Sequence, residues 1–118
     1  MDSINMKTLA LITILSVFSM GLTSMAQANS KESYYTNQMA NYATIIGRAT
    51  ACGSDPTKEL KKVGVWMDQW FDELNLSQKM RATYLNIFME GTKHHLLQQK
   101  SGNSPDTCKS VQKAFRSL

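Results

Sequence analysis

The stretches CGSDPT, residues 52–57, and SGNSPDTC, residues 101–108, each combine a proline, an aspartate and one of the chain's two cysteines. Such stretches are typical of helix boundaries, because a polar side chain can cap free backbone N–H groups and proline is tolerated at the first helical position. Gly53 is suited to end a preceding helix, because glycine adopts the left-handed conformation that helix ends often need. The two stretches therefore predict two helix boundaries, each with a cysteine beside it.

Helical periodicity runs up to residues 52–57 and resumes after them, and no alternating strand pattern is longer than a few residues. The first pattern predicts an amphipathic helix over 33–51, with Arg48 on its polar face. Asp55 is expected to cap the second helix, with Pro56 in its first position. The residues expected to face the core are Tyr35, Met39, Tyr42, Ile46 and Ala49 in the first helix, and Leu60, Val63, Met67, Trp70, Phe71 and Leu74 in the second.

Two more helices are predicted on either side of the second stretch. A third opens at Ser77 and ends in the loop-forming residues QQKSGNSPD, 98–106. A fourth is expected to be capped at Ser104, with Asp106 in its first turn, where the helix dipole favours a carboxylate. The expected inward residues are Met80, Tyr84, Ile87, Phe88, Leu96 and Leu97 in the third helix, and Cys108, Val111, Phe115 and Leu118 in the fourth.

Four helices joined by short loops favour an up-down-up-down bundle. In that topology the end of the first helix and the start of the fourth lie at the same pole, which brings Cys52 and Cys108 together. A small exported domain with two cysteines commonly joins them in one bridge, worth roughly 4 kcal/mol for a loop of this length. The sequence thus predicts an all-α, four-helix up-down bundle stapled by one disulfide, with free thiols or an intermolecular link as alternatives.

Residues 1–28 have the pattern of a cleaved secretory signal peptide. Lys7 precedes an apolar run from Leu9 to about Leu22, and Ala26-Gln27-Ala28 fits a cleavage site. The run is shorter than the roughly 20 residues that a bilayer span needs, although an uncleaved anchor helix is the alternative interpretation. Residues 29–118 are then the mature helical domain, expected in the periplasm, with an extracellular location as the alternative, and without a transmembrane segment. Met6 is a second candidate start beside Met1.

Charge and motifs exclude several classes of function. The formal net charge is +4, but basic residues are dispersed, and the densest group, Lys58, Lys61 and Lys62, is interrupted by Glu59. This pattern is typical of a solvated helix face, so no nucleic-acid partner is expected. The sequence has no nucleophile elbow, no phosphate-binding glycine loop and no H-E-x-x-H motif. We expect no enzymatic activity and no cofactor.

Glu90, His94 and His95 are the most metal-like group in the sequence. A glutamate and a histidine one helical turn apart can place two ligands on one face. The adjacent histidines diverge by about 100° around a helix, however, and no second pair of ligands has suitable spacing. We therefore expect no bound metal, with His95 partly buried and hydrogen-bonded and His94 on the surface.

Two apolar features exceed what a bundle core requires. Leu85, Met89 and Leu96 form a second strip on the third helix, and Trp66 lies at the edge of the second helix's buried stripe. Exposed apolar patches and edge tryptophans are typical of protein-binding surfaces, so these four residues are the candidate partner-binding site, with ordinary core as the alternative. Gly47 is expected instead to let another helix approach closely.

The runs IIGRATACG (45–53), MDQWF (67–71), YLNIFMEGT (84–92) and SPDTCKSV (104–111) are similar in layout to small exported helical proteins of proteobacteria, mostly of unassigned function. Some of these proteins accompany conjugation or type IV secretion machinery, which implies an accessory role. In size, helicity and single disulfide the chain also resembles acid-stress periplasmic chaperones, but it lacks their tryptophan-and-cysteine segment near the mature N-terminus.

These observations predict a non-enzymatic periplasmic module that binds another envelope protein, as an accessory factor of a secretion or envelope assembly. A homodimer is the alternative partner. The alternative functions are an acid-stress-type chaperone and an inhibitor or immunity protein directed against an exported enzyme.

Overall fold

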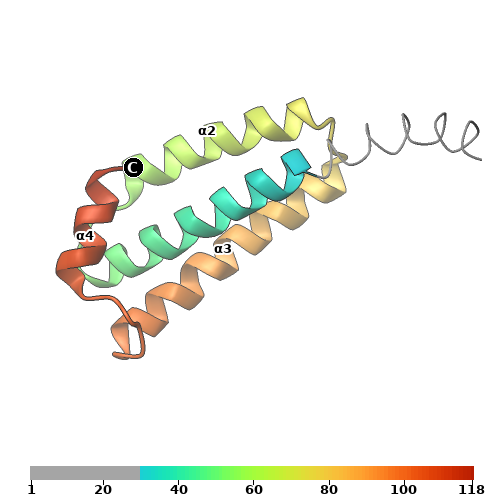
Figure 1. Ribbon diagram of the computed structural model, residues 1–118. Helices are drawn as coiled ribbons and strands as arrows, with labels where there is room; N and C mark the ends of the chain where they lie inside the picture. Colours follow the sequence, from blue (N-terminus) through green and yellow to red (C-terminus); the bar gives the residue numbers. More distant parts are fainter. Residues whose placement is uncertain (1–29) are drawn as a thin grey trace, which may run out of the picture. The chain divides into compact units, whose positions relative to one another are not determined.

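Helices make up all the regular structure of residues 30–118, the part of the chain that the computed structural model describes. A first helix covers 30–51 and is followed by α2 (Thr57–Glu73), α3 (Gln78–Lys100) and α4 (Cys108–Arg116) (Figure 1). Residues 35–118 form one compact unit. The all-α prediction is confirmed for this region, whereas the predicted signal peptide and its cleavage site lie outside the described residues.

The three long helices end in the same way. Gly53, Asn75 and Gly102 have φ angles of 99°, 51° and 81°, in the left-handed region. Backbone N–H groups of the next residues then return to carbonyls in the last helical turn, with Ser54 N to Ala49 O as one example at 2.9 Å. This paired arrangement is a Schellman motif, which satisfies carbonyls that the helix leaves free. The predicted role of Gly53 is confirmed.

Side-chain caps begin α3 and α4, whereas the N-cap of α2 is Pro56, which makes no side-chain cap hydrogen bond; the expectation that Pro56 takes the first helical position is wrong by one residue. The Asp55 carboxylate, one residue earlier, accepts hydrogen bonds from Thr57 Oγ1 at 2.7 Å and Thr57 N at 3.0 Å, which lower the pKa of Asp55. Ser77 Oγ accepts from Met80 N, as expected. The prediction for Ser104 is wrong, because the N-cap of α4 is Thr107, which accepts from Ser110 N.

The core lies mainly between the first helix and α2. Val111 is the buried residue of α4, and Phe88 is the only residue of α3 that is buried. The expectation that Leu60, Met80, Ile87 and Leu97 face the core is wrong, since they are 38% to 52% exposed. Cys108, also expected to face inward, is exposed. The other buried hydrophobic residues are Met39, Ala43, Ile46, Ala49, Val63, Met67, Trp70 and Phe71.

The fourth helix is short and does not extend the bundle along its length. Its nine residues span about 14 Å, against about 35 Å for α3 with 23 residues. Figure 1 shows α4 running across the pole where the first helix ends and α2 begins. Gln112 Nε2 donates to Cys52 O at 3.0 Å, which fixes α4 against the end of the first helix. The helical bundle therefore consists of three long helices, with the short α4 crossing one end of it.

A disulfide and an ion pair hold this pole together. Cys52 and Cys108 are bonded, with their Cα atoms 5.6 Å apart, which confirms the predicted pairing. Arg48 Nη1 donates to Asp106 Oδ2 at 2.6 Å, and Arg48 Nη2 donates to Gln98 Oε1 at 3.1 Å. The Arg48 side chain is only 11% exposed, so its assignment to the open polar face is wrong. Asp106 lies in the loop before α4, where it pairs with Arg48.

Candidate functional site

The third helix presents most of its large apolar side chains to solvent. The five that are exposed, here called the α3 apolar surface, are Met80 (38%), Leu85 (41%), Ile87 (50%), Met89 (65%) and Leu97 (52%). Soluble monomers seldom gather so many large apolar side chains on one exposed helix unless another molecule covers them. Methionine adds adaptability, because its flexible thioether fits irregular partner surfaces.

Four residues of this surface lie on the two flanks of the Phe88 side of α3, and Leu97 lies on the side opposite Phe88. Leu85, Met89 and Leu96 share one flank by helical spacing, and Leu96 is half-buried. Met80 and Ile87 lie on the other flank, and sequence reasoning missed them as surface residues because their spacing also fits a core stripe. Their exposure depends on which neighbouring helix covers that flank, and the apolar period does not contain this information.

The flank of α3 that carries Ile87 borders a hollow of about 240 Å³ beside the first helix. Its lining is strongly apolar and includes Ala40 and Ala43 of the first helix and Ile87 and Gly91 of α3. The small side chains of these alanines and the lack of a side chain at Gly91 leave the space open. The α3 apolar surface therefore continues into a shallow depression.

Trp66 lies against the first helix, in an aromatic cluster. Its ring centroid is 5.1 Å from that of Tyr42, 6.1 Å from that of Tyr35 and 6.0 Å from that of Trp70. Within residues 30–118 its ring contacts are with the first helix and α2, whereas Leu85, Met89 and Leu96 are on α3. The structure thus places Trp66 and the α3 strip on different helices, with different neighbours.

Close packing between the first helix and α3 occurs at Gly47, as expected. A Cβ atom added there would lie 2.3 Å from the backbone oxygen of Thr92 and 3.1 Å from the backbone nitrogen of Leu96. Gly47 thereby fixes how α3 sits on the first helix. That position determines which flanks of α3 remain exposed.

The two histidines differ as the sequence predicts. His95 is half-buried, with Nε2 3.1 Å from Thr44 Oγ1 and Nδ1 3.3 Å from Gln98 Oε1. His94 is exposed, and the two ring centroids are 5.2 Å apart at an interplanar angle of 75°. No group of three or more potential metal ligands occurs within residues 30–118. The absence of a bound metal stays a prediction for elemental analysis.

His95 should make stability depend on pH. Burial lowers the pKa of His95 below the ordinary value of 6.5; the Gln98 hydrogen bond opposes this, and Arg48 and His94 add to it. The unfolded chain therefore takes up a proton at a higher pH than the folded protein does, and stability falls as the pH drops below about 6.5.

Urea unfolding at about pH 7 and at about pH 5 measures how much the free energy of unfolding falls between the two pH values. This decrease should be smaller for His95→Gln than for the wild type. His94→Gln is the control and should retain most of the wild-type difference, because His94 makes the smallest of the four contributions to the His95 pKa. Equal pH dependence of His95→Gln and the wild type would contradict the assignment. The hydrogen bonds from Thr57 to Asp55 affect stability in a separate and more acidic range, below the ordinary Asp55 pKa of 3.8.

The chain matches no protein-family model, no curated protein and no solved structure. Within residues 30–118 no helix combines the length and the apolar character that crossing a bilayer requires.

Proposed function

We propose that the protein is an exported, non-enzymatic module that binds another protein of the cell envelope through the α3 apolar surface. The observation that carries the proposal is the imbalance within α3, which buries Phe88 alone while five large apolar side chains are exposed. Covering such side chains releases water from apolar surface, which is the main favourable term in most protein association.

The surrounding charges favour a protein partner with polar groups at its rim. Lys79, Glu90 and Lys93 are exposed on the same helix, and they mix both signs around the apolar side chains. An apolar centre with a mixed polar rim is the usual composition of a transient protein interface. The layout-level resemblance to exported proteobacterial proteins supports an accessory role in a conjugation, type IV secretion or envelope assembly.

Export is part of the same proposal. The disulfide is compatible with an oxidising compartment such as the periplasm, where a bridge of this kind persists. A signal peptide at residues 1–28 would deliver the chain there.

Met89→Asp should separate an interface from a core position. Met89 is 65% exposed, so a carboxylate there stays in water, and the free energy of unfolding should change by no more than about 0.5 kcal/mol. Loss of an interface anchor and introduction of a charge should weaken partner binding by about 2 kcal/mol or more. Circular dichroism melts give the first quantity, and quantitative pull-down from a periplasmic extract gives the second.

Asn86→Asp is the matched control, because Asn86 is exposed on the same helix and gains the same single charge without loss of an apolar side chain. It should bind as the wild type does. Two results would refute the interface: unfolding of Met89→Asp, which would make Met89 core, or unchanged binding by the folded variant. Sedimentation of each variant shows whether the partner is a second copy.

A further inference from the structure

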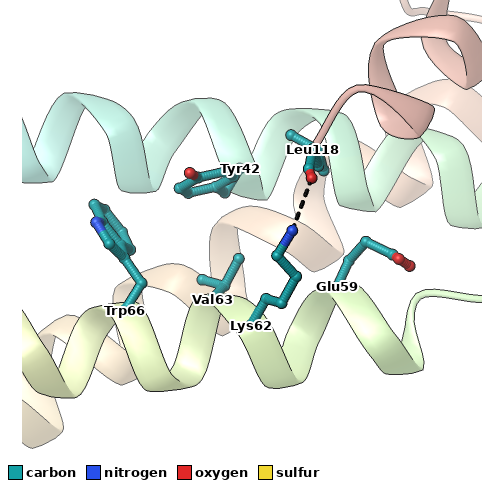
Figure 2. A pocket seen from close by; sticks show the side chains of 6 residues that line it. All are labelled: Tyr42, Glu59, Lys62, Val63, Trp66 and Leu118. Carbon is teal, nitrogen blue, oxygen red and sulfur yellow. Dashed lines mark hydrogen bonds between the residues drawn. The ribbon is translucent and has the colours of Figure 1, made fainter.

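A hollow of about 260 Å³ lies between the first helix and α2, on surfaces that the α3 proposal does not use. Figure 2 shows its aromatic part, with the rings of Tyr42 and Trp66 beside Val63, and its polar part, with Lys62, Glu59 and Leu118. Trp66 and Tyr42 contact each other edge to face at 5.1 Å, so this wall is well packed. The hollow is smaller than most drug-sized sites and suits a small ligand.

A second hollow of about 420 Å³ continues from the first. The two share Glu59, Lys62 and Leu118, and the second adds Lys58 of α2 and Phe115 and Arg116 of α4. Together they form one groove, here called the Trp66 groove. Its apolar end is at Trp66, and its charged end is at Lys58, about 12 Å along α2 by helical rise.

Positive charge prevails at the charged end of the groove. The charged side chains that line it are Lys58, Lys62 and Arg116, with Glu59 as the acidic one. The ion pairs of Arg48 with Asp106 and of Arg81 with Asp72 involve none of these three cations, although Lys62 is already hydrogen-bonded to Leu118 O. An anion entering here would meet Lys58 and Arg116, which take part in neither of these ion pairs.

Lys62 stands where the two ends of the groove meet. Its Nζ donates to the main-chain oxygen of Leu118 at 3.0 Å, which holds the ammonium over the groove (Figure 2). An ammonium has three donors, so Lys62 can keep this bond and still donate to a ligand. A hydrogen bond between two charged groups is about twice as strong as a neutral one.

We propose that the Trp66 groove binds a small anionic amphiphile, with its head group on Lys62, Lys58 and Arg116 and its short apolar tail against Val63, Tyr42 and Trp66. The charge separation along the groove matches such a molecule: the cations face its anion, and the aromatic end covers its hydrocarbon. A neutral molecule with the same tail would make only the apolar contacts. A free carboxylate and the head of a single-chain lipid offer the same chemistry.

Fluorescence titration of the folded protein with octanoate and with octanol tests this charge selectivity, because Trp66 lines the groove and reports occupancy. Octanoate should bind saturably and more tightly than octanol. Lys62→Gln should weaken octanoate about tenfold, the expected effect of losing one charge-assisted contact, and leave octanol unchanged. Lys61→Gln is the matched control, since Lys61 is exposed on the same helix and does not line the groove; it should bind as the wild type does.

Equal binding of octanoate and octanol, no saturable binding, or equal effects of Lys62→Gln and Lys61→Gln would overturn the proposal. Titration with octyl phosphate and with vesicles that carry anionic lipids distinguishes the two sources of the head group: tight binding of octyl phosphate alone indicates a free ligand, and binding of both indicates a lipid. Met89→Asp should bind octanoate as the wild type does, so the proposal for the Trp66 groove and the proposal for the α3 apolar surface can be refuted independently of each other.

Discussion

Replacing Cys52 and Cys108 together with serine is expected to lower the free energy of unfolding by about 4 kcal/mol. The bridge joins residues 56 positions apart and therefore removes much of the conformational freedom of the unfolded chain. Such a loss is a large part of the 5 to 15 kcal/mol, roughly, that native domains possess. Urea unfolding of the double variant and of the oxidised wild type measures the difference.

The double variant is preferable to a single one, because it leaves no unpaired thiol that could form intermolecular links. The reduced wild type is a second reference and should unfold at the same urea concentration as the double variant. Two free thiols in wild-type protein purified without reductant would refute the bridge. Equal stability of the oxidised wild type and the double variant would show that the bridge does not stabilise the fold.

Gly47→Ala is the second substitution with a large expected effect. Its new methyl group would lie 2.3 Å from the backbone oxygen of Thr92, so the first helix and α3 must move apart. Overpacking of this kind typically costs about 1 to 3 kcal/mol, and the obstacle here is backbone, which cannot change rotamer. We expect a loss of about 3 kcal/mol or more, measured by urea unfolding.

Gly64→Ala supplies the control for Gly47→Ala. Gly64 is inside α2, and a Cβ atom there would meet nothing within 4 Å. Alanine is the better helix former by about 1 kcal/mol, so this variant should be more stable than the wild type. Equal effects at the two glycines would contradict the close contact between the first helix and α3.

Local chemistry explains which features of the fold could be predicted. The hydrogen bonds at Gly53, Asp55 and Ser77 are formed with residues less than two helical turns away in the sequence. Such short-range hydrogen bonds can be inferred from a few neighbouring residues. The disulfide followed from the same boundaries, because they placed both cysteines at one pole. Each of these inferences needed only the order of the helices and the residues at their ends.

The start of α4 was missed because contacts between distant residues determine it. Ser104 had the local features of a cap, but Arg48 pairs with Asp106, and Gln99 Nε2 donates to the Asp106 main-chain oxygen at 3.1 Å. These contacts hold Asp106 outside the helix, and Thr107 becomes the cap. The partners lie in the first helix and in α3, so the residues around Ser104 do not reveal them.

For the candidate site, too, some features could be predicted from the sequence and others could not. Periodicity correctly indicated that Leu85 and Met89 lie beyond the core stripe, and both are exposed. It failed for Ile87, because an apolar period shows which side chains share a face but not whether a neighbour covers that face. It also did not reveal that Trp66 packs with Tyr42 on the first helix, since that pairing depends on how two helices pack.

Site-specific photo-cross-linking in the cell that makes the protein tests the proposed α3 interface most directly. A photoreactive residue would replace Met89 or Leu85 on the α3 apolar surface, and Gln69, an exposed polar residue of α2, in the control. We expect one discrete covalent adduct from positions 89 and 85, none from position 69, and loss of the position-89 adduct when Leu85→Asp is added. No adduct from either α3 position, or the same adducts from all three, would contradict an interface on α3.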